Sequence, residues 1–314
     1  MPIHTCMQKE LQSVNIKKYR RNDYRQLLII MVPSLVLLLL FRYIPYNGLI
    51  IAFQDFNIFK GIRNSPFVGF DQFKRAFTNT DFARIVGNTI YINGIKTLFY
   101  VPLPLIVAIL LNEMTSIRLK RIIQTTIYLP HFLSWVIVAG LAVSLLSVNV
   151  GIVNRVIRAL GAKSIGFMVD KYAFRWVIVF SAMWKEIGWG SIIFLASIAG
   201  IDPQLYEAAV IDGASRIAQV RYITIPSITS TIVLVALLSL GNILKRSFEQ
   251  VFVMYNPAVY ETSDIINTYV YRYGIGQLEY SYSTAIGVFN SIIGFILVIT
   301  TNSLTRKYLG RSLW

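Results

Sequence analysis

Residues 27–43 read LLIIMVPSLVLLLLFRY, an apolar run in which Arg42 is the only charged residue. A helix needs about 20 such residues to span the hydrocarbon core of a bilayer. Five further apolar blocks follow, at residues 89–111, 127–148, 176–199, 228–244 and 284–304. Lipid offers the backbone no hydrogen bonds, and the blocks are too long and too uniformly apolar for barrel strands. The sequence therefore predicts an all-α membrane protein with a bundle of six transmembrane helices.

The composition agrees with a membrane location. Charged residues make up 14% of the 314 residues, whereas a soluble domain carries about 25%. A soluble α/β enzyme with an oily core is disfavoured, because the apolar residues come in long blocks. The net charge of +15 suits anionic lipid headgroups. Basic and aromatic residues alternate at 17–24, and we interpret them as a membrane-surface anchor, not as a nucleic-acid site.

Basic residues before the first apolar block predict the orientation of the chain. This tail, residues 1–26, contains Lys9, Lys17, Lys18, Arg20, Arg21 and Arg25. Such residues favour the cytoplasmic side. Six crossings from residue 27 to 304 then return the C-terminal tail, 305–314, to the cytoplasm. The segment 44–88 becomes an external loop and 200–226 a cytoplasmic loop, although the external loops also carry several basic residues.

Residues for catalysis or metal binding are scarce. Cys6 is the only cysteine, and His4 and His131 are the only histidines. We expect no disulfide, no metal site and no catalytic centre. The stretch Gly161-Ala-Lys-Ser164 lacks the upstream glycine of a phosphate-binding loop, so we also expect no bound cofactor and no ATP site in this chain.

The expected cytoplasmic loop contains a helix–turn–helix. Asp202 followed by Pro203 is an N-cap with proline at the first helical position. A short helix is predicted from Pro203 to Asp212, and Gly213 can end it in a left-handed conformation. A second short helix should reach about residue 222, and Pro226 should mark the start of the fifth span.

The first short helix has the composition of a docking element. Ala208 and Ala209 leave its backbone unshielded, and Glu207 supplies one carboxylate for an ionic contact. An ordinary capped loop would have a similar pattern, and these residues alone leave both interpretations open.

The spacing of this loop resembles the EAA loop of ABC importer permeases. Glu207-Ala208-Ala209 is followed after three residues by Gly213, and after nine more by Ile223-x-Ile225-Pro226, with Asp212 before the glycine. Ile225 replaces the commoner leucine, a change that conserves volume. The resemblance implies that the short helix inserts into a cleft of an ATPase subunit. It also implies two ATPase copies that bind ATP and Mg, a second homologous permease subunit, and an extracellular or periplasmic solute-binding protein.

Two stretches near the N-terminus point to a narrower branch. Residues 51–57, IAFQDFN, and 65–70, SPFVGF, resemble carbohydrate importer permeases for complex sugars. This resemblance implies import of an oligo- or polysaccharide, such as alginate, across the inner membrane of a bacterium.

Polar residues inside the apolar blocks are candidates for the solute pathway, because charges in a bilayer usually face the bundle interior or a wet cavity. The charged candidates are Lys96, Lys185 and Glu186, and neighbours on a helix point in different directions. The other candidates are Asn88, Asn93, Asn242, Asn290, Trp184 and Trp189. Interhelical packing of the asparagines and interfacial anchoring of the tryptophans are the alternatives. An ion-coupled secondary transporter that uses the three charges is the competing function. A membrane enzyme is disfavoured, because no acid–base pair or metal cluster supports it.

Overall fold

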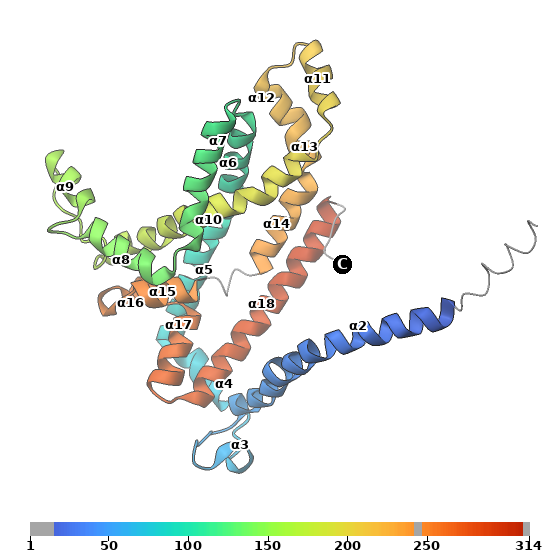
Figure 1. Cartoon of the computed structure of the whole chain (residues 1–314). Coiled ribbons are helices and arrows are strands. Elements are labelled where there is room, and N and C mark those ends of the chain that lie inside the picture. The colour runs from blue at the N-terminus through green and yellow to red at the C-terminus, as the bar shows by residue number, and fades with distance from the viewer. Residues whose placement is uncertain (1–15, 242–246, 310–314) are drawn as a thin grey trace, which may run out of the picture.

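The computed structural model describes residues 16–241 and 247–309, and these ranges are built from helices (Figure 1). The only paired extended backbone within them is an isolated antiparallel bridge between Gln54 and Phe67. Four helices are long and apolar enough to cross a membrane: Arg25–Phe53, Thr80–Glu113, Lys171–Ala199 and Tyr280–Ser303. Two bent pairs add up to two spans: Ile117–Phe132 with Trp135–Leu146, and Arg216–Ser227 with Thr229–Gly241. The predicted all-helical membrane fold is therefore confirmed, with up to six crossings.

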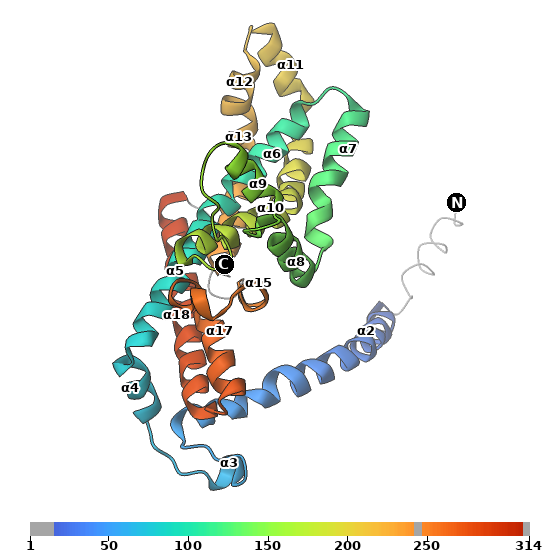
Figure 2. The same ribbon diagram turned by 90° about the vertical axis from the view of Figure 1, so that its left-hand side faces the viewer.

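Most of the first span stands away from the remaining helices (Figures 1 and 2), and its C-terminal part packs against α18 (Tyr280–Leu309). It consists of α2 (Ile16–Leu38), a π-helical turn η1 (Leu39–Tyr43) and a 3-10 helix η2 (Ile44–Phe53). None of its most apolar window is buried within the described chain. The basic residues from Lys17 to Arg25 lie in α2, so part of the expected basic tail belongs to this helix.

The expected external loop 44–88 is mostly helical. After η2 it contains α3 (Gly61–Asn64), α4 (Asp71–Thr78) and the start of α5 (Thr80–Tyr100). The side chain of Asn79 caps α5 by accepting a hydrogen bond from the backbone N–H of Asp81 at 2.9 Å, which is why the helix begins before the apolar block does. α5 ends at Tyr100 and α6 (Pro102–Glu113) follows, because proline cannot continue the hydrogen-bond ladder.

The prediction of one continuous helix over residues 127–148 is wrong. The segment is divided among α7 (Ile117–Tyr128), the 3-10 turn η3 (Leu129–Phe132) and α8 (Trp135–Leu146), with a bend of 105°. Pro130 lies inside η3, and the Ser134 side chain starts a new helix by accepting from the backbone N–H of Ile137 at 3.3 Å. Arg118, Lys120 and Arg121, which lie between the apolar blocks 89–111 and 127–148, are part of α7.

The helix α10 (Lys171–Ala199) is the centre of the bundle, and it packs against α5, α6, α7 and η3. Its most apolar window is 44% buried, more than that of any other candidate span in the described chain. Phe174 and Ile178 belong to one hydrophobic core with Ile92, and Phe194 belongs to a second core with Ala108. α10 therefore holds both ends of the bundle together.

The remaining helices complete both ends of the molecule. Their bounds are α9 (Ile152–Ala159), α11 (Pro203–Ile211), α12 (Arg216–Gln219), η4 (Val220–Thr224), α13 (Ile225–Ser227), α14 (Thr229–Gly241), α15 (Phe248–Met254), η5 (Pro257–Val259), α16 (Tyr260–Ser263), α17 (Ile266–Tyr271), η6 (Arg272–Gly276) and α18 (Tyr280–Leu309). A third core joins α4, α5, α17 and α18 through Phe82, Tyr269 and Tyr282. In Figure 1, α11 and α12 lie at one end of the molecule, and α3 and α4 lie at the other.

Gly188 marks the closest approach of α10 to α7. A Cβ atom built on Gly188 would overlap the backbone carbonyl of Ile127. Backbone cannot move aside as a side chain can, so we expect Gly188→Ala to destabilise the bundle although alanine is the better helix former. The midpoint of thermal unfolding of the detergent-purified protein should fall by roughly 5 °C or more.

Gly87→Ala is the matched control, because a Cβ there meets no atom within 4 Å in α5. An unchanged midpoint for Gly188→Ala would contradict the close packing of α7 on α10.

Candidate functional site

The segment from α11 to η4, residues 203–224, forms an elbow whose turn follows local chemistry. A carboxylate oxygen of Asp202 accepts a hydrogen bond from the backbone N–H of Gln204 at 3.0 Å and caps α11. Gly213 has a φ of 77°. The backbone N–H of Ala214 donates to the carbonyl of Ala209 at 2.8 Å, and that of Gly213 donates to Val210 at 3.0 Å. This is a Schellman turn, and the predicted helix, cap and left-handed glycine are confirmed.

Contacts inside the elbow make it one unit. The Tyr206 hydroxyl lies 2.9 Å from that of Thr224, and the Gln219 amide donates to the carbonyl of Ala214 at 3.1 Å. The guanidinium of Arg216 lies 3.1 Å from the carboxylate of Glu113, at the last residue of α6. A groove of about 780 Å³ separates the end of α6 from the elbow. The elbow is thus connected directly to the span that begins as α5.

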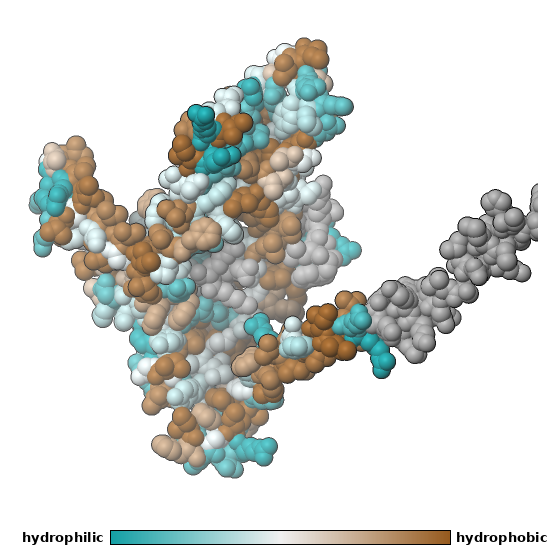
Figure 3. Space-filling view, viewed as in Figure 1, coloured by the Kyte–Doolittle hydropathy of each residue, from teal (hydrophilic) through white to brown (hydrophobic). Residues whose placement is uncertain are grey.

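The outer surface of the elbow is apolar. Its exposed apolar side chains are Leu205, Val210, Ile211, Ile217 and Tyr222, of which Ile211 is 86% exposed. Figure 3 shows hydrophobic residues gathered at this tip. Glu207 and Ala208 are also exposed, and Ala209 is half-buried. A cluster of exposed apolar side chains indicates a surface that another protein covers.

Pro226 lies in the short helix α13, after the elbow. The bent pair that contains it turns by 63° between Ser227 and Thr229. The predicted start of the fifth span near Pro226 therefore holds, and the straight part of that span begins at Thr229.

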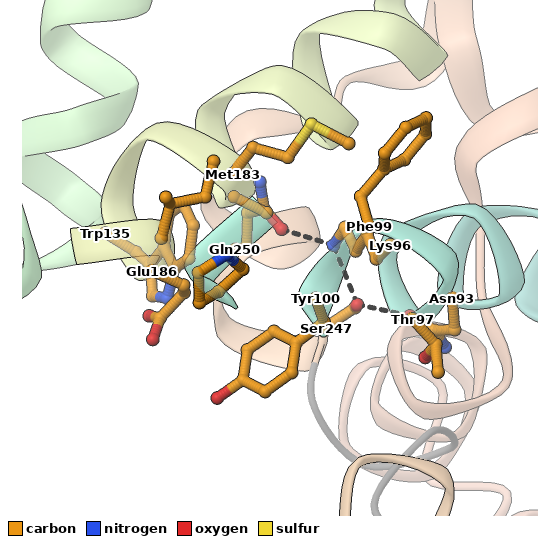
Figure 4. A pocket seen from close by; sticks show the side chains of 13 residues that line it. Asn93, Lys96, Thr97, Phe99, Tyr100, Trp135, Met183, Glu186, Ser247 and Gln250 are labelled. Carbon is orange, nitrogen blue, oxygen red and sulfur yellow. Dashed lines mark hydrogen bonds between the residues drawn. The ribbon is translucent and has the colours of Figure 1, made fainter. Parts of the chain in front are cut away.

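A polar cavity of about 190 Å³ lies between α5, α8, α10 and α15 (Figure 4). Three of the predicted pathway residues line it: Asn93, Lys96 and Glu186. The sequence analysis missed Thr97, Tyr100, Trp135, Ser247 and Gln250, which also line it. The structure thus brings together charged, hydroxyl, amide and aromatic groups at one place inside the bundle.

Lys96 is the centre of the hydrogen bonds in this cavity. Its amine donates to the Ser247 hydroxyl at 2.8 Å and to the side-chain oxygen of Gln250. The Ser247 hydroxyl in turn donates to the side-chain oxygen of Asn93. The amide of Gln250 donates to the carbonyl of Ile178 at 2.7 Å. These bonds connect α5, α10 and α15 at the cavity wall.

The helical spacing of polar residues on α5 is a sequence signal that could have identified part of this site. Asn93, Lys96, Thr97 and Tyr100 stand at positions i, i+3, i+4 and i+7, which share one face of a helix. Ser247 and Gln250 carry no such signal, because their place depends on how α15 packs.

Glu186 occupies the wall of the cavity opposite Lys96, as Figure 4 shows. One of its carboxylate oxygens lies 3.3 Å from Nδ1 of His131. The His131 ring stacks on Trp189 with 4.4 Å between centroids and 3° between planes. The Trp189 indole, a pathway candidate, therefore packs on a cavity neighbour and does not line the cavity itself.

Lys185 turns away from Glu186 and is only 6% exposed. Its amine donates to the carbonyls of Pro130, His131 and Leu133, with a distance of 2.7 Å to Leu133. These carbonyls lie at the break between α7 and α8, where the helical ladder is interrupted. Lys185 thus stabilises the bend, and, as expected of neighbours on a helix, it does not pair with Glu186.

The other pathway candidates lie elsewhere. The Asn88 amide donates to the carbonyls of Glu261 and Asp264, and its oxygen accepts from Arg175 at 2.7 Å, which favours the packing interpretation. Trp184 lines an apolar groove of about 600 Å³ between α8, α9 and α10. The Asn290 amide donates to the side chain of Asn267 at 3.2 Å. Asn242 lies outside the described residues.

Known proteins resemble this chain over most of its length. Residues 100–310 match the family described as binding-protein-dependent transport system inner membrane component. Protein LplB of Bacillus subtilis (strain 168) is 44% identical over 282 residues, 90% of this chain and 89% of that protein. The polygalacturonan/rhamnogalacturonan transport system permease protein YteP of the same organism is 41% identical over 284 residues, 90% of this chain and 88% of that protein.

Two solved structures share the fold. A bacterial ABC transporter involved in the import of the acidic polysaccharide alginate matches with a TM-score of 0.85 and 37% identity, over 93% of this chain and 99% of the other. A bacterial alginate ABC transporter in complex with an alginate pentasaccharide-bound periplasmic protein also gives 0.85, with 36% identity over 94% and 99%. The close structural match to both transporters shows that this chain has the architecture of a transporter subunit.

We expect Lys185→Met to destabilise the bundle, because the substitution removes the lysine donor from the backbone carbonyls of His131 and Leu133 in apolar surroundings. Each unsatisfied buried group costs about 1–3 kcal/mol. The thermal midpoint of the detergent-purified protein should fall by several degrees. Lys74→Met, at an exposed position on α4, is the control and should leave the midpoint unchanged. Equal midpoints for both variants would show that Lys185 does not hold the bend.

Proposed function

This chain belongs to the family of binding-protein-dependent transport inner membrane components and is a carbohydrate ABC importer permease, and we propose that its elbow couples the solute pathway to a separate ATPase. The observation that carries the proposal is the exposed apolar tip around Ile211, which has Glu207 at its side. A surface of this kind needs a partner, and the carboxylate supplies an ionic contact to a basic residue of that partner.

The elbow is suited to transmit movement. Its Schellman turn and the Tyr206–Thr224 contact fix its shape. Arg216 links it to Glu113 at the end of α6, and α13 leads from it into α14. Closure of an ATPase pair would therefore move both spans together and tilt the bundle between inward-open and outward-open states.

The ATP chemistry belongs to the partner in this proposal. Two ATPase copies bind ATP and Mg, and this chain contributes no catalytic group and no cofactor site. A second, homologous permease covers surface that the single chain leaves open, including the unburied first span. A solute-binding protein outside the membrane delivers the sugar, by analogy with the similar alginate transporter that was solved together with its pentasaccharide-bound periplasmic protein.

The proposed substrate is an oligo- or polysaccharide such as alginate. The similar proteins are described as carriers of alginate and of polygalacturonan or rhamnogalacturonan. The polar cavity offers the groups that a sugar chain needs, with amide, hydroxyl and charged side chains beside the aromatic rings of Tyr100 and Trp135.

The proposed topology places both chain ends and the elbow in the cytoplasm of a bacterial cell. The elbow lies between the fourth and fifth crossings, so six crossings leave it on the same side as residues 1–26 and 305–314. α3 and α4, at the opposite end of the molecule (Figure 2), then face the binding protein.

Replacing Glu207 by Ala tests the ionic contact of the elbow. In proteoliposomes that contain the assembled transporter and its binding protein, we expect ATP-driven uptake to fall about tenfold or more, because a charged hydrogen bond contributes roughly 1.5–3 kcal/mol. ATP hydrolysis should lose its stimulation by loaded binding protein. Arg121→Gln, at an exposed position on α7 outside the elbow and the cavity, should change neither rate. Full uptake in Glu207→Ala would refute the coupling role, and uptake that needs a proton gradient but no ATP would favour an ion-coupled transporter.

Replacing Gly213 by Val tests the shape of the elbow. A side chain at a φ of 77° costs about 1–3 kcal/mol of backbone strain. We expect the turn to relax and ATP turnover to continue without uptake. Gly161→Val introduces the same strain at a φ of 82° in the loop after α9, and it should preserve the ratio of uptake to ATP turnover. The coupling role fails if the two variants show the same ratio.

A further inference from the structure

The cavity around Lys96 contains donors that the described chain leaves unused. A lysine amine has three N–H groups, and Lys96 uses one for Ser247 and one for Gln250. Asn93 is 2% exposed, and its amide nitrogen has no hydrogen-bond partner. Both residues line the cavity. A buried donor without a partner is costly, so the wall formed by Asn93 and Lys96 is suited to an acceptor that comes from outside the chain.

The surroundings of Lys96 differ from those of the buried Lys185. Lys185 is matched by three backbone carbonyls. The hydrogen-bond partners of Lys96 in the described chain are neutral side chains. Placing a cation inside a bilayer costs free energy, so an intramembrane lysine indicates a functional position by default. A neutral hydroxyl or amide side chain could connect α5 to α15 equally well, so the structural tie alone does not explain the charge of Lys96.

We infer that Lys96, assisted by the amide of Asn93, binds the carboxylate of an acidic sugar unit and makes this permease selective for uronates over neutral sugars. The inference rests on the proposed function and adds the chemical class of the substrate and the residue that recognises it. An arriving carboxylate stabilises the protonated amine, because an opposite charge within about 4–6 Å favours the charged form. Charge-assisted hydrogen bonds of this kind are about twice as strong as neutral ones.

The other walls of the cavity suit the rest of a sugar ring. The cavity measures about 190 Å³. Phe99, Tyr100 and Trp135 provide aromatic surface for the apolar face of a ring, and Glu186 can accept hydrogen bonds from hydroxyls.

The two charges of the cavity orient the ring. Lys96 and Glu186 lie on opposite walls (Figure 4). Glu186 has His131 at 3.3 Å as its own partner. A uronate would direct its carboxylate toward Lys96 and its hydroxyls toward Glu186, because the reverse placement brings two carboxylates together.

The test compares two probes of equal length in proteoliposomes with the assembled transporter: an alginate pentasaccharide and its carboxyl-reduced, neutral form. Lys96→Met should lower uptake of the acidic probe at least tenfold and change uptake of the neutral probe less than twofold. Since the binding protein is the same in every sample, its own preference cancels when variants are compared. Lys96→Arg keeps the cation and should retain most of the acidic preference.

Asn93→Asp keeps the volume of the side chain but replaces the free donor by an acceptor. It should lower acidic uptake relative to neutral uptake even if Lys96→Met assembles poorly. Glu186→Gln removes the repelling charge and should leave the acidic-to-neutral ratio unchanged or raise it. Equal losses for both probes in Lys96→Met would show a merely structural tie between α5 and α15, and an unchanged ratio in both Lys96→Met and Asn93→Asp would overturn the inference.

The two proposals fail in different ways. Wild-type uptake that does not depend on ATP would contradict the proposed function for either probe. ATP-dependent uptake with the same acidic-to-neutral ratio in the wild type and in Lys96→Met would contradict only the role of Lys96.

Discussion

Backbone groups inside a bilayer find no hydrogen-bond partner outside the protein, and this chain interrupts its helices within apolar stretches. The sharpest interruption is the 105° bend between η3 and α8. The carbonyls of Pro130, His131 and Leu133 at this bend accept hydrogen bonds from one buried amine, that of Lys185. Because Lys185 stands on α10, the central helix, and because Gly188 lets α7 approach to backbone contact one turn later, the bend and the centre of the bundle depend on each other.

The same interruptions create the polar cavity. The end of α5 at Tyr100, the bend before Trp135 and the start of α15 at Phe248 surround it with helix ends. Straight helices would fill this space with apolar side chains. The breaks therefore provide the polar groups with room, and the hydrogen bonds from Lys96 and Gln250 to neighbouring elements limit how far the walls can separate.

Features set by local chemistry could be predicted from the sequence, and features set by packing could not. Asp202, Pro203 and Gly213 determine the elbow through a cap, a fixed φ and a left-handed turn, and all three act within a few residues. The hydrogen-bond partners of Asn88 and Lys185 come from segments more than 50 residues away. The sequence therefore could not show whether a given intramembrane polar residue packs against another helix or lines a cavity. Hydrophobicity alone also missed the break at residues 129–134, because Pro130 and Ser134 add little polarity to the block.

The ion pair between Arg216 and Glu113 connects the two halves of the candidate site. Glu113 ends the helical run that carries Lys96 near its middle, with the proline break at 101–102 between them. In the proposed coupling, a displacement of the elbow would reach α6 through this pair, and α6 packs on α10. α10 in turn carries Glu186 on the opposite cavity wall. If the elbow moves as proposed, elements that are already in contact connect it to both walls of the cavity. The break after Tyr100 separates the α5 wall from α6.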